Sequence, residues 1–230
     1  MPGPDVTMGK LIVIEGTDGS GKSTQFRLLS DRLSSEGYVF KHIVFPRYSE
    51  PSSSLIRMYL GGDFGKKPTD VNAYAASTFY AVDRYASYKQ DWGSWYENGG
   101  LILSDRYTTS NAVHQASKEP DERRSEFLRW LYELEYEKMG LPKPDLTIYL
   151  DVPTDFTEML LRRRESDTGT AFDIHEQDTS YLATCREMGR SAAKFYGWTV
   201  VDCVHNGVMR SIPDIHNEIY SYVSALLNER

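Results

Sequence analysis

The chain has 230 residues, of which 40% are hydrophobic, and carries a formal net charge of −7. This length suits one large or two small domains, and the hydrophobic content suffices for a sizeable core and excludes a disordered chain. The acidic balance excludes a protein built to coat nucleic acid, so we expect small anions as partners and no nucleic acid.

The first residues and the cysteines indicate a cytoplasmic protein. No apolar run approaches the roughly 18 residues of a membrane span, so no membrane is expected as a partner. Residues 1–7 lack the apolar core of a signal peptide, and we interpret them as a disordered extension or a cloning remnant before a single domain over residues 8–230. Cys185 and Cys203 lack C-x-x-C spacing, which indicates neither a zinc site nor a disulfide framework and favours a reducing compartment.

The first predicted element is a buried strand over Lys10–Glu15, which runs directly into a glycine-rich loop and a helical pattern over Gln25–Leu33. The loop matches G-x-x-x-x-G-K-[ST], the pattern of a phosphate loop. Its glycines let successive N–H groups point into one cavity, and the helix dipole adds positive potential there. The sequence therefore predicts a nucleoside triphosphate site formed by Gly16, Thr17, Asp18, Gly19, Ser20, Gly21, Lys22, Ser23 and Thr24.

Two side chains of this loop carry the expected chemistry. We expect Lys22 to reach the β- and γ-phosphates as a point charge, and the Ser23 hydroxyl, on the first turn of the helix, to ligate Mg²⁺. The alternative is a glycine-rich turn that binds nothing. The strand before the loop and the amphipathic helix after it make that alternative the weaker one.

Further along the chain, short β-branched runs alternate with helical patterns, which is typical of a parallel sheet with helices on both faces. The runs are nearly continuous in apolar residues, as in strands covered on both sides. The longest predicted helix covers Asp70–Glu97, and a loop over Gly61–Pro68 precedes it. The predicted strands are Lys10–Glu15, Val39–Pro46, Leu101–Ser104, Asp145–Val152 and Thr199–Cys203.

Asp105 and Arg106 follow one of these strands, at the edge where parallel α/β sheets bind ligands. There a carboxylate can hold the Mg²⁺ shell through water, opposite Ser23, and an arginine can clamp a second phosphate. Alone, the pair is better explained as an ion pair that caps a strand, but a phosphate loop nearby favours the functional interpretation. Arg47 ends another strand, and two converging arginines suggest an acceptor that itself carries phosphate.

These motifs make the chain similar to thymidylate kinases, the P-loop enzymes that phosphorylate dTMP to dTDP. The resemblance implies a three-layer α/β P-loop NTPase fold with a five-stranded parallel sheet flanked by helices. It also implies a lid over residues 162–178, ATP with Mg²⁺ as the donor, and commonly a homodimer. The matching segments are Glu15-Gly-Thr-Asp-Gly-Ser-Gly-Lys-Ser-Thr24, Phe45-Pro-Arg47, Tyr80-Ala-Val-Asp-Arg84, Asp105-Arg-Tyr107 followed by Ser110-Asn111, and Gly140-Leu-Pro-Lys-Pro-Asp145.

The resemblance also implies a dTMP site. Asp18 matches a carboxylate that contacts the 3′-hydroxyl of dTMP or a magnesium-linked site near its phosphate, and Arg47 and Arg106 match arginines that hold that phosphate. Tyr80 and Arg84 share a helical face because they are four positions apart. They match an aromatic ring that stacks on thymine and an arginine that donates to thymine O4. Core packing with a surface charge is the alternative for this second pair.

Three further residues complete the implied dTMP site. Asn111 matches an amide that reads thymine N3, since an amide both donates and accepts. His114, on the same helical face, stands where relatives carry an aromatic residue near the ribose C2′; the alternative is a structural histidine. Glu176 matches a lid carboxylate near the acceptor phosphate, or is a solvated lid charge. Phe79 adjoins Tyr80, so the sequence leaves open which ring stacks on the base.

The expected reaction is an in-line transfer of the γ-phosphoryl group of ATP to a phosphate oxygen of dTMP, promoted by positioning and charge neutralisation. Some thymidylate kinases carry an arginine inside the phosphate loop, where this chain has Gly19. The resemblance therefore points to the arginine run at the start of the lid for the additional cation, with a merely basic helix end as the alternative. The expected catalytic residues are Lys22, Asp18, Arg106, Arg162, Arg163 and Arg164.

Other functions are weaker alternatives. A deoxynucleoside kinase has an uncharged acceptor and would not need both Arg47 and Arg106 at a phosphate, while guanylate-, adenylate- and shikimate-kinase-like enzymes remain within the reaction class. A regulatory GTPase would require a guanine-reading Asn-Lys-x-Asp element, which the chain lacks. A P-loop module that senses nucleotide without turnover would bind ATP but transfer nothing to any monophosphate.

Overall fold

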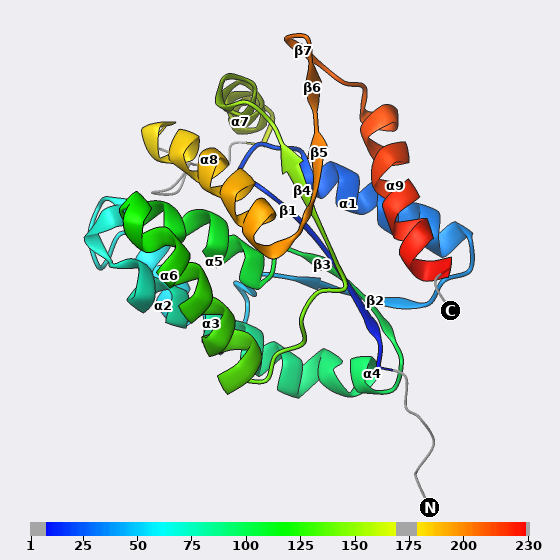
Figure 1. Cartoon of the computed structure of the whole chain (residues 1–230), viewed down its shortest axis with the longest axis horizontal. Coiled ribbons are helices and arrows are strands. Elements are labelled where there is room, and N and C mark those ends of the chain that lie inside the picture. The colour runs from blue at the N-terminus through cyan, green and yellow to red at the C-terminus, as the bar shows by residue number, and fades with distance from the viewer. Residues whose placement is uncertain (1–7, 169–178, 229–230) are drawn as a thin grey trace, which may run out of the picture.

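Five parallel strands form the central sheet of the computed structural model (Figure 1). The structure describes residues 8–168 and 179–228 and, of Arg164, Asp167, Thr168 and Thr179, the backbone alone. The predicted extension over residues 1–7 lies outside the described residues. The strand order is β2-β3-β1-β4-β5, and each neighbouring pair is parallel, which confirms the predicted five-stranded parallel sheet. The strands are β1 (Lys10–Gly16), β2 (Phe40–Val44), β3 (Leu101–Asp105), β4 (Leu146–Asp151) and β5 (Thr199–Asp202).

The central position of β1 brings the predicted motifs together. β1 lies between β3 and β4, and Ile14 pairs in register with Asp105 of β3. Because the carboxyl ends of parallel strands meet at one edge of the sheet, the phosphate loop after β1 emerges beside Asp105 and Arg106. The segment after β2, which contains Arg47, emerges next to β3.

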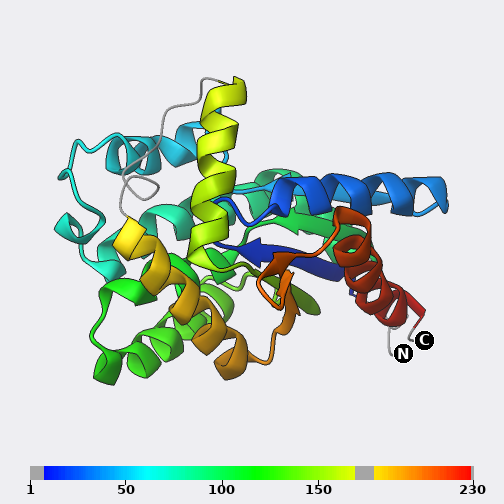
Figure 2. The same cartoon turned by 90° about the horizontal axis from the view of Figure 1, so that it is seen from above.

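Helices cover both faces of the sheet, which gives the three layers expected. α1 (Lys22–Ser35) and α9 (Ile212–Asn228) lie together on one face (Figure 2). There Phe26, Leu29 and Leu33 of α1, at helical spacing, join the core under β1, β3 and β4. On the other face lie α3 (Ala73–Ser87), α4 (Gly93–Glu97), α5 (Thr108–His114), α6 (Asp121–Tyr132) and α8 (Thr179–Tyr196).

The predicted helix over Asp70–Glu97 is divided in the structure. Asp70 belongs to a 3₁₀ turn over Pro68–Asp70, and α3 begins only after Asn72, whose Oδ1 accepts from the N–H of Ala75 at 2.8 Å. Such a side-chain cap marks a helix start. A π-helical segment, Tyr88–Trp92, then joins α3 to α4, and a second one, Glu133–Lys138, continues α6.

The remaining elements are short or lie at the rim. α2 (Ser54–Leu60) follows a 3₁₀ turn over Pro51–Ser53, and another turn, Ala116–Lys118, follows α5. The predicted strands do not include the hairpin of β6 (Val204–His205) and β7 (Val208–Met209). Its turn is Asn206-Gly207, both with left-handed backbone, the geometry that two-residue hairpin loops need.

Two further expectations need correction. β2 is an edge strand with Val44 exposed, so it is not covered on both sides. The arginine run starting at Arg162 lies inside α7 (Thr154–Thr168) rather than after that helix, and the rest of the predicted lid, residues 169–178, lies outside the described residues. Cys185 and Cys203 are free and buried. Within residues 8–168 and 179–228, no helix could span a bilayer.

Candidate active site

The phosphate loop holds its lysine in place. Gly19 and Gly21 have left-handed backbone, with φ of 78° and 83°, and a Cβ on Gly19 would lie 2.6 Å from a backbone oxygen of α7. Only glycine therefore fits at that position. Lys22 begins α1, and its ammonium donates to the carbonyl oxygens of Gly16 and Thr17, each at 2.8 Å. These oxygens keep the ammonium at the mouth of the loop, where phosphate oxygens can replace them.

The surroundings of Lys22 weaken its hold on a proton. Burial removes its ammonium from water, and the positive charge of Arg106 acts in the same direction, so the pKa of Lys22 is lowered to about 8. The carboxylates of Asp18, Glu15 and Asp105 only partly oppose this effect. In the free protein, Lys22 is therefore charged at neutral pH and loses its charge in mildly alkaline solution.

We expect ATP affinity to fall as the pH rises through about 8. Above that pH the unbound protein has lost the Lys22 proton, which ATP binding must restore, because phosphate oxygens favour the ammonium form. Calorimetry of ATP binding in buffers of different ionisation enthalpy measures this proton uptake directly. An affinity that stays constant between about pH 7 and pH 9, with no proton uptake, would contradict the lowered pKa.

Glu15, the penultimate residue of β1, holds several polar groups of the site together, a role that the sequence did not reveal. Its carboxylate is fully buried and accepts hydrogen bonds from the hydroxyls of Thr109 (2.7 Å) and Ser110 (2.6 Å) and from the N–H of Gly16 (2.9 Å). Arg106 donates to it at 3.5 Å. Glu15 thus connects the phosphate loop to the first turn of α5.

Arg106 connects Glu15 to Asp18 of the phosphate loop. Its backbone is left-handed, with φ of 66°, a conformation uncommon for a side chain with a Cβ and often found at functional sites. The guanidinium pairs with Asp18 and lies 3.2 Å from Nε2 of His114. Burial disfavours its charge, but the carboxylates of Asp18 and Glu15 more than compensate and raise the pKa of Arg106. The arginine is held as a permanent cation between the two predicted sites.

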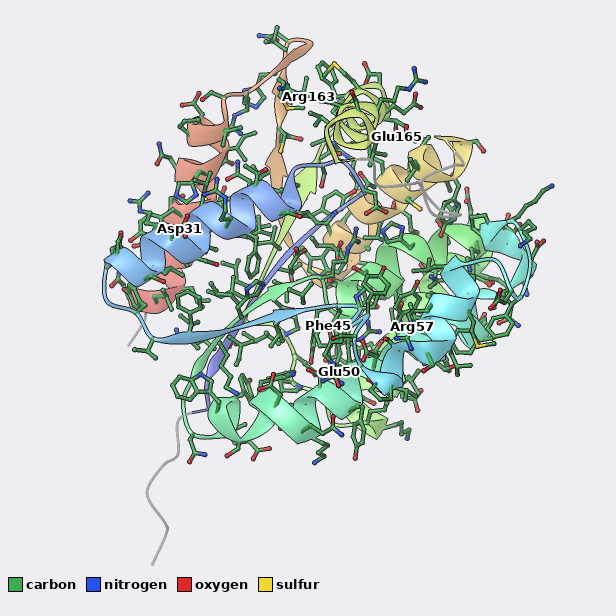
Figure 3. All side chains as sticks on the ribbon, turned by 180° about the vertical axis from the view of Figure 1, so that it is seen from behind. Asp31, Phe45, Glu50, Arg57, Arg163 and Glu165 are labelled. Carbon is green, nitrogen blue, oxygen red and sulfur yellow. The ribbon has the colours of Figure 1, made fainter. Side chains whose placement is uncertain are left out.

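A cavity of about 280 Å³ opens beside the phosphate loop at the ends of β2 and β3. Phe45, at the end of β2, lines it and is labelled in Figure 3. Asp105, predicted to hold the metal shell, lines it as well. So do six of the eight residues predicted to bind the acceptor: Asp18, Tyr80, Arg84, Arg106, Asn111 and His114.

Arg47 and Glu176 are the other two residues predicted to bind the acceptor. Arg47 is engaged by Asp83, whose carboxylate accepts from its backbone N–H (2.9 Å) and its Nε (3.3 Å), and Arg47 also donates to Ser52. Glu176 lies outside the described residues. Arg106 is therefore the arginine that the described structure places in the cavity wall beside the phosphate loop.

Part of the cavity lining is polar and preorganised by hydrogen bonds. Arg84 is 1% exposed and forms a two-point ion pair with Glu135, from Nε at 2.7 Å and from Nη2 at 2.6 Å. Asn111 donates to the same carboxylate at 3.3 Å. Burial opposes the charge of Arg84, but Glu135 outweighs burial and raises the pKa of the guanidinium. The structure also separates the two candidate rings: Tyr80 lines the cavity, whereas the Phe79 ring packs on Phe64 with a centroid distance of 5.9 Å.

The predicted lid arginines lie on a helix that touches the phosphate loop. The Cβ position of Gly19 falls 2.9 Å from a side-chain carbon of Leu161 on α7. Arg162 is exposed and lies 4.0 Å from Glu158; Arg163 and Glu165, labelled in Figure 3, are exposed on the same helix. The Arg164 side chain lies outside what the structure describes.

The donor atoms present suit Mg²⁺ shared with a nucleotide. Ser23 presents an exposed hydroxyl at the start of α1, and Asp105 offers a carboxylate at the end of the adjoining β3. Among the described residues, no group of three or more His, Cys, Asp or Glu side chains could enclose a metal. Mg²⁺ commonly takes one or two protein oxygens and completes its shell with water and phosphate, so a hydroxyl and a carboxylate are a sufficient donor set.

Together, the central phosphate loop and the adjoining cavity with a buried arginine define a P-loop kinase of the nucleotide-phosphorylating class. The family model described as thymidylate kinase matches residues 14–219. Thymidylate kinase of Mycobacterium tuberculosis is 31% identical over 170 residues, which cover 73% of this chain and 78% of the relative. A probable thymidylate kinase of Pyrococcus horikoshii is 32% identical over 216 residues, with coverage of 94% and 96%.

A solved structure, that of thymidylate kinase from Candida albicans, shares the fold with a TM-score of 0.70 at 24% identity, covering 97% of this chain and 94% of that one. The chain belongs to the thymidylate kinase family. Membership confirms the predicted fold class and the predicted activity, phosphorylation of dTMP to dTDP with ATP as donor.

Proposed function

We propose that ATP binds at the phosphate loop, that dTMP binds in the cavity, and that the γ-phosphoryl group passes between them beside Asp18 and Arg106. One observation carries this assignment: Asp18 belongs to the phosphate loop and also lines the cavity, and Arg106 pairs with it. Two phosphates held on either side of one fixed ion pair are prepositioned for an in-line transfer.

The charges of the site fit this transfer. The acceptor phosphate is already ionised at neutral pH, so no general base is needed, and Arg106 holds it against the repulsion of the donor. Lys22 exchanges the oxygens of Gly16 and Thr17 for the donor phosphates. Bound Mg²⁺, held by Ser23 directly and by Asp105 through water, would supply further charge neutralisation at those phosphates.

Within the cavity, we assign thymine to Tyr80, Arg84 and Asn111. The Tyr80 ring supplies an apolar face for stacking, Arg84 donates to thymine O4, and Asn111 reads N3. His114 also lines the cavity and lies 3.2 Å from Arg106, and we assign it to the sugar. Arg47 and Glu176 are proposed at the acceptor phosphate on the resemblance to the family alone.

Equilibrium binding tests the two-site assignment. dTMP and a non-hydrolysable ATP analogue should bind to one protein molecule together, with a stoichiometry of one each, because Asp18 is the one residue of the phosphate loop that also lines the cavity. Mutual competition between them would show that dTMP occupies the phosphate loop instead.

The additional cation is assigned to the arginine run on α7. Because successive helical residues point about 100° apart, we expect at least one of Arg162→Ala, Arg163→Ala and Arg164→Ala to lower kcat about 10²-fold with little change in KM for dTMP. That pattern marks a contact made chiefly in the transition state. Steady-state kinetics of the single variants measures it, with Glu165→Ala on the same helix as the control. Three near-normal variants would refute the assignment.

A homodimer in the cytoplasm completes the proposal. Large apolar side chains are exposed on α2, the following loop and α3, and a second copy of the chain would cover them: Leu55, Met58, Phe64, Val82 and Tyr85. The two free cysteines agree with a reducing compartment. Sedimentation velocity tests the dimer: the unmodified protein should sediment as a dimer and Val82→Glu as a folded monomer, whereas a monomeric unmodified protein would refute it.

A further inference from the structure

Glu135 is a buried charge that contacts both proposed base-reading residues of the cavity lining. Its carboxylate is fully buried and lies in the π-helical segment Glu133–Lys138 that follows α6. It accepts two hydrogen bonds from Arg84, at 2.7 and 2.6 Å, and one from Asn111, at 3.3 Å. One carboxylate therefore fixes a guanidinium and an amide at the same time.

These contacts decide which way the Asn111 amide points. Its Nδ2 donates to the carbonyl oxygen of Ser77 at 3.2 Å and to Oε1 of Glu135. An ionised carboxylate and a backbone carbonyl can only accept, so the NH₂ group must face them and the amide oxygen must face the other way. Asn111 also lines the cavity. The oxygen is thus the end that Asn111 presents to a ligand.

The same carboxylate fixes the orientation of the Arg84 guanidinium. The Glu135 carboxylate accepts hydrogen bonds from Nε and Nη2, and the carbonyl oxygen of Tyr107 accepts one from Nη1 at 3.2 Å. Because a guanidinium carries five N–H donors, further N–H groups on Nη1 and Nη2 are available at the cavity that Arg84 lines. The cavity therefore presents a donor from Arg84 beside an acceptor from Asn111.

We propose that Glu135 is a positioning residue that makes the site specific for thymine over cytosine. The inference rests on the proposed binding of the base by Arg84 and Asn111. Thymine offers an acceptor at O4 and a donor at N3, which match this order, whereas cytosine offers the opposite order, a donor at N4 and an acceptor at N3. With Glu135 in place, cytosine would meet donor against donor and acceptor against acceptor.

The π-helical segment explains how a glutamate outside the recognised motifs arrives there. A π segment inserts an extra residue into the helical turn and redirects the side chains that follow it, and such segments are frequent at functional sites. Here the segment brings Glu135 to a partner 51 positions away in the chain, Arg84, and to one 24 positions away, Asn111.

The test is Glu135→Gln, which keeps the shape of the side chain but replaces one acceptor oxygen by an NH₂ donor. The Asn111 amide can then turn its NH₂ group toward the base. We expect kcat/KM for dTMP to fall by about 10-fold or more and kcat/KM for dCMP to rise or stay constant, so that the dTMP-to-dCMP ratio drops at least about 10-fold. Glu133→Gln, at an exposed glutamate of the same segment, is the matched control and should keep the ratio.

Thermal melting shows whether the variants fold. If Glu135→Gln does not fold, Glu135→Asp is tested in its place. Aspartate keeps the negative charge opposite Arg84, but its carboxylate is one methylene further from Asn111. Glu135→Asp should therefore also lower the dTMP-to-dCMP ratio. A folded variant with an unchanged ratio overturns the inference. Asn111→Ala shows whether the proposed base site is itself wrong. If Asn111→Ala also leaves the dTMP-to-dCMP ratio unchanged, the base binds elsewhere. If Asn111→Ala lowers the ratio and the Glu135 variants do not, only the role of Glu135 is wrong.

Discussion

Lys22→Ala is expected to lower kcat by about 10²–10³-fold and to leave the affinity for dTMP nearly unchanged. The ammonium donates to oxygens of the phosphate loop, where the donor phosphates bind, and losing one contact that stabilises charge in the transition state costs about this much. The acceptor cavity is lined by other residues, Arg106 among them. Steady-state kinetics measures kcat, and calorimetry measures dTMP binding.

A matched control is Lys41→Ala, which removes a partly exposed lysine of β2 that pairs with Asp91. It should be neutral in both measurements. If dTMP affinity collapsed in Lys22→Ala as strongly as turnover, the division between a donor loop and an acceptor cavity would be wrong.

Arg106→Met is expected to weaken dTMP binding by about 10²–10³-fold, because truncating one member of a buried charge pair costs roughly 2–5 kcal/mol. The side chain is largely buried between Glu15 and Asp18, and its loss leaves both carboxylates without this cation. Calorimetry with dTMP measures the loss, and the melting temperature reports whether the fold persists.

Arg47→Met provides the comparison. Arg47 is already engaged by Asp83 and Ser52, so we expect it to weaken dTMP binding less than Arg106→Met does. If Arg47→Met were the more damaging change while Arg106→Met bound dTMP normally, the acceptor phosphate would lie toward β2 rather than at the Asp18–Arg106 pair.

The sequence predicted the phosphate loop and the residues beside it because these depend on short contiguous motifs and on the topology of a parallel sheet. The strand, glycine-rich loop and helix around Lys22 are contiguous, and parallel strands bring their carboxyl ends to one edge, so Asp105 and Arg106 are brought next to the phosphate loop by topology alone. The four-residue spacing of Tyr80 and Arg84 likewise predicted a shared face, and both line one cavity.

The parts that escaped prediction depend on contacts between distant segments. Glu15 read as the end of a strand, since its partners Thr109 and Ser110 lie more than 90 positions later. Glu135 received no predicted role, because a π segment cannot be recognised from apolar periodicity and its partner Arg84 is on another helix. For Glu15 the available signal was an acidic residue at the end of an apolar strand, which calls for a buried cation or donors.

The most direct test of the central claim is the rate of ADP release from Mg-ATP with dTMP, dUMP, UMP, CMP, AMP and GMP as acceptors. We predict that dTMP is fastest, that dUMP is moderately slower because it lacks a methyl group worth about 1–3 kcal/mol, and that CMP is far slower because its edge opposes Arg84 and Asn111. Equal rates with CMP and dTMP, or ATP binding without transfer to any of these acceptors, would contradict the account.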